Sequence, residues 1–364
     1  MDENMDPFEG MADPFENKGV AAMDDSFKDD VKDMDAFFED CVNLGKSWHK
    51  SLPPRVKQGL KGSCGAIAFL AVISTIIYSK TSKMYQLSPK YLYDRVGSRG
   101  TSFLHYSIAL AIWGVLPEVY YPYNLKWPSW RQLAGETSKN PPAPNIKDAP
   151  KLYLGDYYLA ETMEDIYKSL QFSPGAVAMR SFEKFNTWKA KDAKTKIYNE
   201  DDISEKEKEE MTQGECRNDG SWHAVLVVAY CCDKESGKDY FIIRNDGWPD
   251  WGYNGFSKVS PKVITVVWFP RGITSMPTGK KLFPWLREFK FQLQGKLNEY
   301  KLEQEKGINM LPSDKEGISF CKSWLDWVDK WLPLFEPIIK AAPNSGPLLS
   351  EDYQNKMALR LVLK

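Results

Sequence analysis

Residues 62–79 read GSCGAIAFLAVISTIIYS, and they open the part of the chain that determines the fold. Gly62 and Ser63 are typical of a tight turn, and the apolar stretch that follows runs from Cys64 to Ser79 without a proline. Its apolar residues are spread nearly all round a helix, which predicts a buried helix. A thiol at a helix N-terminus is favoured as thiolate by the helix dipole and the free backbone N–H groups. Taken alone, this cysteine is equally well interpreted as a buried structural residue.

A second stretch, residues 222–230, reads WHAVLVVAY and predicts a buried strand. A polar turn over residues 233–238 and a return strand over residues 240–244 complete a hairpin. An antiparallel hairpin brings its open ends together, so His223 and Asn245 should be neighbours. An amide oxygen that accepts from one imidazole nitrogen fixes the ring and leaves the other nitrogen to exchange a proton. The pattern therefore predicts an oriented general base.

The chain contains only three histidines, which limits the choice of a base. His105 falls within a predicted helix over residues 102–113, and His49 lies in the lead-in to the globular zone. A packed or surface role is the preferred interpretation of both. The other cysteines are less well placed than Cys64: Cys231 and Cys232 lie at the hairpin turn, Cys216 in a charged loop over residues 184–220, and Cys41 and Cys321 outside the globular zone.

Composition divides the chain into three zones. Residues 1–45 are acidic, and we expect them to be disordered or propeptide-like, since residues 1–40 carry fourteen acidic residues and three lysines. Residues 46–272 should form the globular domain, with helices in its first half and strands in its second. The sequence pattern of residues 273–364 predicts a mostly helical, tryptophan-rich C-terminal extension.

Bulk properties narrow the class of protein. Apolar residues make up 43% and charged residues 27% of the chain, as in ordinary globular proteins. A net charge of −1 argues against a nucleic-acid partner. No signal peptide is visible, and the longest apolar run, residues 66–77, is shorter than the roughly 20 residues of a membrane span. Six cysteines are too few for a disulfide scaffold, so we expect a reducing compartment such as the cytoplasm, a virion or a host cytoplasm.

Six blocks of sequence, in order, resemble the papain-like cysteine proteases, and the short lead-in over residues 52–56 is most similar to compact microbial and viral members. The blocks are QGLKGSC at 58–64, LSPKYLYD at 87–94, GVLPEVYYPY at 114–123, GAVA at 175–178, HAV at 223–225 and NDGWPDWGYNGF at 245–256. The resemblance implies an α+β, two-lobed fold. A helical lobe and an antiparallel, β-barrel-like lobe would flank the active-site cleft, and the helical C-terminal extension would be additional.

The resemblance also implies roles for individual residues. Cys64 would be the nucleophile of a cysteine endopeptidase that works through a thioester, with His223 as base and acid and Asn245 orienting it. The side chain of Gln58 and the backbone N–H of Cys64 would form the oxyanion hole.

Gly100 and Thr101 align with the segment that binds the substrate backbone in this family. The implied partners are protein or peptide substrates. Neither a cofactor nor a metal is implied.

The chain departs from the family pattern at several positions. Lys61 and Arg95 replace two cysteines that normally pair with each other. Gly65 follows the nucleophile where tryptophan is usual, and residues 246–248 read Asp-Gly-Trp instead of Ser-Trp-Gly. Two alternatives to an active peptidase therefore remain: a catalytically weak or inactive papain-fold binding or structural protein, and a cysteine-dependent acyl transferase.

Each tail carries a further hypothesis. The acidic head is either a solvated tail or an autoinhibitory segment across the cleft. Trp324, Trp327 and Trp331 are spaced so that they share one helical face. This stripe would either dock a protein or a membrane surface or, as we prefer, pack onto its own domain.

Overall fold

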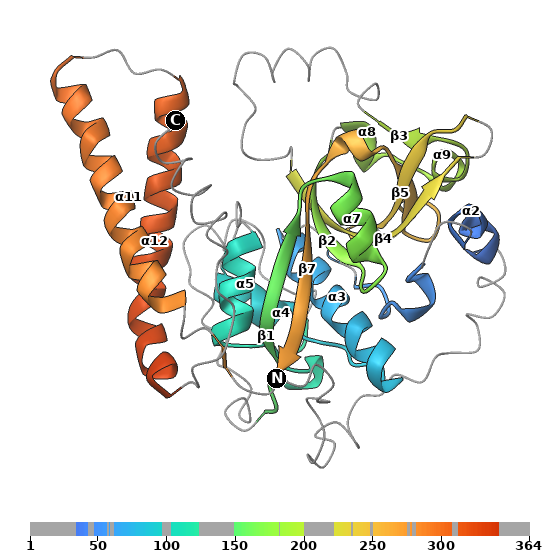
Figure 1. Ribbon diagram of the computed structural model, residues 1–364, viewed down its shortest axis with the longest axis horizontal. Coiled ribbons are helices and arrows are strands. Elements are labelled where there is room, and N and C mark those ends of the chain that lie inside the picture. The colour runs from blue at the N-terminus through green and yellow to red at the C-terminus, as the bar shows by residue number, and fades with distance from the viewer. Residues whose placement is uncertain are drawn as a thin grey trace.

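The computed structural model of the chain describes most of the predicted globular domain and the C-terminal extension (Figure 1). Predictions on Lys61, Gly100, Thr101 and Trp248 fall outside the described residues, as does most of the acidic head. The described ranges are 34–42, 47–56, 58, 62–96, 103–123, 149–181, 183–199, 222–233, 236–247, 250–274, 277–278, 282–307 and 312–341.

The first half of the domain is helical, as predicted. Its main helices are α3 (Cys64–Thr81), α4 (Pro89–Val96) and α5 (Phe103–Ile112), with short 3-10 turns at His49–Ser51 (η2) and Glu118–Tyr120 (η3). Among the described residues, only α3 is long and apolar enough to cross a membrane. It is instead the central core helix, because 67% of that window is buried inside the protein.

In the second half, the described residues form one seven-stranded sheet in the order β1-β7-β2-β4-β5-β6-β3. Neighbouring strands are antiparallel except β3 and β6, and over the residues that the structure describes the sheet is not closed into a barrel. The predicted α+β class and the β4–β5 hairpin are confirmed. The strands are β1 (Tyr153–Ala160), β2 (Gly175–Arg180), β3 (Ile197–Tyr198), β4 (Trp222–Cys232), β5 (Asp239–Arg244), β6 (Phe256–Val259) and β7 (Ile264–Thr274).

Helix α3 joins the two halves. It packs against β4, β2 and β7 on one side and against α4 and α5 on the other (Figure 1). Most of its buried apolar residues belong to a single core cluster that also contains the inner residues of the sheet. The first turn of α3 therefore lies where the helical part meets the strands. The remaining short elements are α7 (Met163–Leu170), α8 (Glu183–Asn186), α9 (Ala190–Thr195) and η5 (Pro261–Val263).

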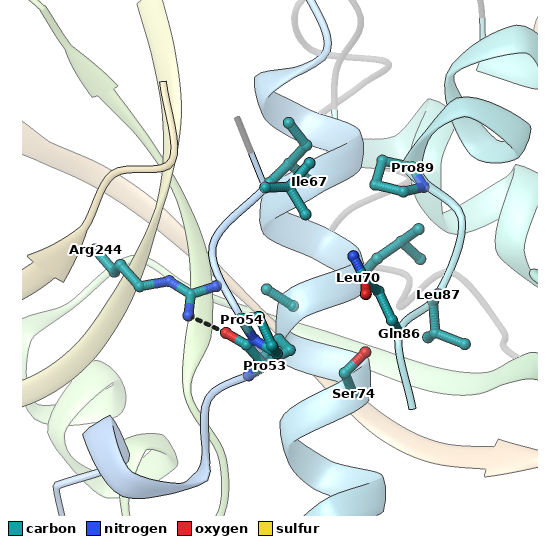
Figure 2. A pocket seen from close by; sticks show the side chains of 11 residues that line it. Pro53, Pro54, Ile67, Leu70, Ser74, Gln86, Leu87, Pro89 and Arg244 are labelled. Atoms are coloured by element: carbon teal, nitrogen blue, oxygen red, sulfur yellow. Dashed lines mark hydrogen bonds between the residues drawn. The ribbon is translucent and has the colours of Figure 1, made fainter. Parts of the chain in front are cut away.

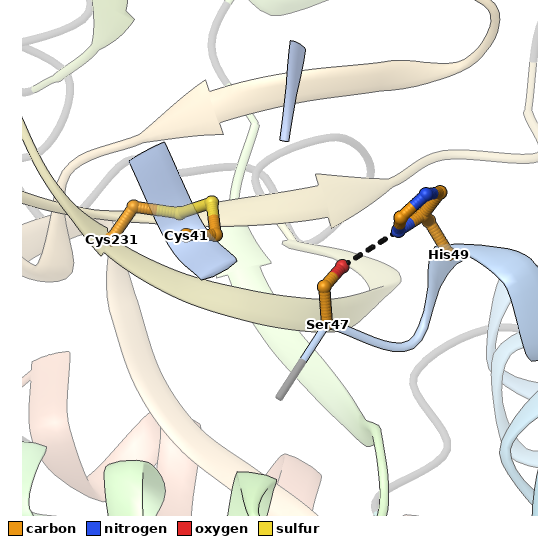
Figure 3. Close-up of a disulfide and its surroundings, with 4 residues drawn as sticks. All are labelled: Cys41, Ser47, His49 and Cys231. Carbon is orange, nitrogen blue, oxygen red and sulfur yellow. Dashed lines mark hydrogen bonds between the residues drawn. A yellow bond between two sulfur atoms is a disulfide. The ribbon is translucent and has the colours of Figure 1, made fainter. Parts of the chain in front are cut away.

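The end of the acidic segment packs onto the sheet. Residues 34–37 and α2 (Glu39–Val42) are helical, and Phe38 stacks on His49 with ring centroids 4.2 Å apart. Cys41, which the composition of the chain places outside the globular zone, is buried and forms a disulfide with Cys231 of β4 (Figure 3). Disulfides are rare in reducing compartments. The expected localisation therefore stays a prediction, and the disulfide is the feature that argues against it.

The C-terminal extension is a pair of long helices, α11 (Leu282–Glu305) and α12 (Pro312–Ala341), lying side by side (Figure 1). His105 of α5 stacks on Trp324 at 3.7 Å between centroids and meets Trp327 edge-on at 4.6 Å. Both indoles are buried, so these two rings pack onto their own domain, as preferred from the sequence. The side chain of Trp331 lies outside the described set.

Candidate active site

Cys64 is the first residue of α3, and its thiol hydrogen-bonds the side chain of His223 on β4. Desolvation by the surrounding protein opposes ionisation of this thiol. The hydrogen bond and the charge of the His223 ring, together with the backbone N–H groups of Ala224 and Gly65, outweigh it and hold the pKa of Cys64 below its ordinary value. The helix start therefore provides a stabilised thiolate.

His223 is held on its other side by Asn245. Its Nε2 lies 2.8 Å from Asn245 Oδ1, and because an amide oxygen only accepts, Nε2 carries the hydrogen. Nδ1 is thus left to face Cys64. Burial lowers the pKa of His223, but the contact with Cys64, the bond to Asn245 and the charge of Asp246 together raise it. The two shifts favour a thiolate–imidazolium pair.

Asn245 is itself fixed by several bonds. Its Oδ1 also accepts from the backbone N–H of Gly247 at 2.9 Å, and the backbone N–H of Asn245 donates to Gly255 O at 2.8 Å. Arg55 Nη2 donates to the Asn245 carbonyl at 3.1 Å. A Cβ on Gly247 would lie 3.0 Å from Asn245 Oδ1, so the glycine allows the chain to turn tightly around the amide. The prediction that His223 and Asn245 are neighbours is thus confirmed.

Gln58, the predicted oxyanion donor, lies beside these residues and is buried. Its backbone N–H donates to Asp246 O at 3.3 Å, and its carbonyl accepts from Tyr123 Oη at 2.9 Å. Since that tyrosine gives its only hydrogen to Gln58, Ser63 donates its hydroxyl hydrogen to the Tyr123 oxygen, at 2.8 Å. The loop that carries Gln58 is therefore tied to the helix start and to the strand end.

Tyr106 of α5 explains how the chain accommodates Gly65. A Cβ built on Gly65 would lie 2.5 Å from a carbon of the Tyr106 ring, so the ring already fills the space beside that residue. Tyr106 also packs on Phe69, with centroids 4.8 Å apart. The space next to the nucleophile is therefore filled by an aromatic ring from another helix.

Phe185 of α8 covers His223. Its ring meets the imidazole edge-on at 5.9 Å between centroids. Trp251 packs on Phe185 at 4.7 Å and donates from Nε1 to its carbonyl. Phe185, backed by Trp251, therefore gives the His223 ring an apolar neighbour on this side. The sequence contained no signal for Phe185 or Tyr106, which lie in no matched motif, and the lead-in over residues 52–56 carried no indication of a role for Arg55.

A small, mostly apolar pocket lies alongside the middle of α3 (Figure 2). Neither Cys64, His223 nor Asn245 lines it, so it is not the reacting centre. Figure 2 shows Arg244 at its wall, donating to the carbonyl of Pro53. The pocket is lined by Pro53, Pro54, Val56, Ile67, Leu70, Ala71, Ser74, Gln86, Leu87, Pro89 and Arg244. Across the part of the chain that the structure describes, no three His, Cys, Asp or Glu side chains gather as metal ligands.

A thiol, an imidazole and a carboxamide in this order define the class of site found in cysteine hydrolases. Residues 45–267 match the sequence model of the family described as papain family cysteine protease. The chain belongs to that family.

Individual relatives are distant. The chain is 28% identical over 227 residues to cathepsin J of Rattus norvegicus, and the match covers 59% of this chain and 59% of the relative. It is 24% identical over 262 residues to papaya proteinase 4 of Carica papaya, covering 68% of this chain and 64% of the relative. The chain thus spans less than two thirds of the length of these relatives. Among solved structures, the bromelain protease of Ananas comosus in complex with the E64 inhibitor matches with a TM-score of 0.43 and 18% identity, over 62% of this chain and 98% of that one.

Proposed function

We propose that the protein is a cysteine endopeptidase that hydrolyses peptide bonds of protein or peptide substrates through a thioester on Cys64. The observation that carries this proposal is the arrangement of three side chains: Cys64 at the start of α3 meets a His223 ring whose Nε2 is held 2.8 Å from Asn245 Oδ1. Family membership supports the same chemistry.

In the proposed reaction the Cys64 thiolate attacks the carbonyl carbon of the scissile bond, and the electron pair of that carbonyl moves onto its oxygen. The side-chain N–H of Gln58 and the backbone N–H of Cys64 stabilise the oxyanion. The His223 imidazolium gives its Nδ1 proton to the leaving amine, the C–N bond breaks and a thioester remains. Water then attacks the thioester, loses a proton to His223 and releases the acid and the thiolate.

Asn245 keeps the ring in the orientation that this exchange needs, because it accepts from Nε2 throughout. Gly100 and Thr101, outside the described residues, remain predicted contacts for the substrate backbone. The bonds from Tyr123 and Ser63 at the helix start support the same arrangement, because they fix the loop that carries Gln58.

The test is a comparison of the wild-type protein with Cys64→Ser on a peptide library, with an epoxide-type thiol reagent as an independent probe. We expect cleavage to fall by ~10⁴-fold or more, because the nucleophile and its base act as a unit. Mass analysis should find the reagent on Cys64. Cys232→Ser, which removes a part-buried thiol at the far end of β4, serves as the matched control and should keep full activity.

Persisting cleavage or labelling of the same site in Cys64→Ser would refute the assignment. A wild-type protein that neither cleaves nor reacts would support a binding role for the fold instead. Transfer of the acyl group to an added amine, at the expense of hydrolysis, would identify an acyl transferase.

A further inference from the structure

Three charged side chains lie next to Asn245: Arg244 and Asp246 flank it in the chain, and Arg55 donates to its backbone carbonyl. Arg244, the last residue of β5, donates from Nη2 to Asp246 Oδ2 at 3.1 Å, and both side chains are only 3% exposed. Arg55, in the lead-in segment, brings its Nε within 3.6 Å of Asp246 Oδ1. One carboxylate thus faces two guanidinium groups in a place largely removed from water. We call Arg55, Asp246 and Arg244 the Arg–Asp–Arg cluster.

The cluster joins two segments that are far apart in the sequence. Arg244 Nη1 donates to Pro53 O at 2.6 Å, and Arg55 Nη2 donates to Asn245 O at 3.1 Å. Each arginine therefore binds the Asp246 carboxylate and also a backbone carbonyl of the opposite segment. Such a planar, multiply bonded group constrains orientation as well as distance.

Gly255 makes room for one of these arginines. It has a φ of 83°, which favours glycine, and a Cβ there would lie 2.5 Å from the Arg55 guanidinium. The carbonyl of Gly255 accepts from the backbone N–H of Asn245. The Arg55 guanidinium thus lies on a backbone that is itself bonded to the base-orienting residue.

We propose that the Arg–Asp–Arg cluster is a positioning device that keeps the amide of Asn245 and the oxyanion donor Gln58 in a fixed relation. Gln58 is included because its backbone N–H donates to the carbonyl of Asp246 and because it follows Arg55 by three residues. Both groups act on the same transition state from different segments, so their relative placement matters to a fraction of an ångström. This inference rests on the proposed function of the site.

Charge gives the cluster a second effect. The carboxylate of Asp246 favours the protonated His223 ring and so contributes to raising the pKa of that ring. Among the described residues, the negative charges that raise the pKa of this ring are the Cys64 thiolate and Asp246. At position 246, where the family pattern has a neutral serine, this chain therefore has a carboxylate that acts on His223. Arg55 and Arg244 hold that carboxylate in place.

The test measures Cys64 directly, because alkylation of a thiol does not require peptide cleavage. Iodoacetamide labelling of Cys64 is followed by peptide-resolved mass spectrometry from pH 4 to 9, in wild type, Asp246→Asn and Asp246→Ser. Where a substrate is cleaved, kcat and KM are measured per titrated active site. Asp239→Asn, an exposed carboxylate at the other end of β5, is the matched control.

For Asp246→Asn we expect the pH profile of labelling to move to lower pH, because loss of the carboxylate makes the Cys64 thiolate easier to form and the His223 imidazolium easier to deprotonate. We expect kcat to fall ~10-fold with KM unchanged within about twofold, less than the 10²–10³-fold cost of deleting an oxyanion donor. Asp239→Asn should match wild type in both measurements. An unchanged labelling profile in folded Asp246→Asn overturns the proposal.

A double variant separates positioning from simple loss of stability. Arg55→Leu is made alone and together with Asp246→Ser. Because Arg55 and Asp246 act together, Arg55→Leu should lower kcat less in the Asp246→Ser background than in wild type. If the two substitutions lower kcat by independent factors that simply multiply, Arg55 and Asp246 are not coupled and the proposal is overturned. If wild type labels at low pH but cleaves nothing, the proposed function fails, while the labelling profiles still decide whether the cluster acts on His223.

Discussion

Gly65 and Asp246 each follow a side chain of the candidate site, and each differs from the family pattern, but the structure accommodates them in opposite ways. At Gly65 volume is missing, and the ring of Tyr106 fills the space from another helix. At Asp246 a charge is added, and it lies between Arg244 at 3.1 Å and Arg55 at 3.6 Å. Volume can be supplied by any apolar neighbour, because dispersion and burial are not directional. A buried charge needs partners in defined geometry.

The comparison predicts that the two positions tolerate change differently. The environment of Gly65 should accept other ways of filling the same space. The environment of Asp246 should not accept removal of an arginine, because the buried carboxylate would lose part of its compensation. Three predictions test this, from the largest expected effect to the smallest.

The largest effect is expected at the charged position. Arg244→Met should lower the free energy of unfolding by about 3–5 kcal/mol, because it leaves the buried Asp246 carboxylate without its closest partner. Urea unfolding followed by tryptophan fluorescence measures it. Lys168→Met, in the exposed pair with Glu164, is the control and should cause no measurable loss. Equal stability of Arg244→Met and wild type would mean that the buried charges are not held by this contact.

Gly65→Ala should cost about 1–3 kcal/mol, because its Cβ would lie 2.5 Å from the Tyr106 ring. Gly295→Ala in α11 is the matched control, since nothing lies within 4 Å of its Cβ; there alanine should stabilise by up to ~1 kcal/mol. Adding Tyr106→Leu to Gly65→Ala should recover part of the loss. If Gly65→Ala behaved like Gly295→Ala, the ring would not be filling this space.

The smallest effect concerns a titratable group that, like Gly65, is packed by aromatic rings. Burial under Trp324 and Trp327 lowers the pKa of His105 from 6.5 to about 3. Below pH 6.5 the unfolded chain binds a proton here and the folded chain does not. The contribution of neutral His105 to the free energy of unfolding is therefore fully present above pH 6.5 and is lost as the pH falls towards 3. Between pH 6.5 and 5 the loss should be about 1.5 kcal/mol.

His105→Phe should flatten that part of the stability curve while keeping the aromatic contact. Thermal unfolding across the same pH range measures the slope in both proteins. Identical slopes would show that His105 titrates alike in the folded and unfolded chains.

Much of the site followed from local sequence. The buried helix from Cys64 and the hairpin that joins His223 to Asn245 are set by short-range periodicity, so both were predictable. The side chains that accommodate Gly65 and Asp246 were not predictable. Tyr106 lies on a separate helix, and Arg55 is 190 residues before Asn245, so tertiary packing selects them. A pattern of apolar and polar residues contains no information about such long-range pairs.

The bond between Cys41 and Cys231 has a topological consequence, because 190 positions separate the two cysteines. It closes a covalent ring that contains Cys64 and His223, while Asn245 lies on the chain beyond it. A single cut anywhere between residues 42 and 230 opens this ring without releasing a fragment. The product is a two-chain molecule in which a cut between residues 65 and 222 places the thiol and the imidazole on different polypeptides that remain joined.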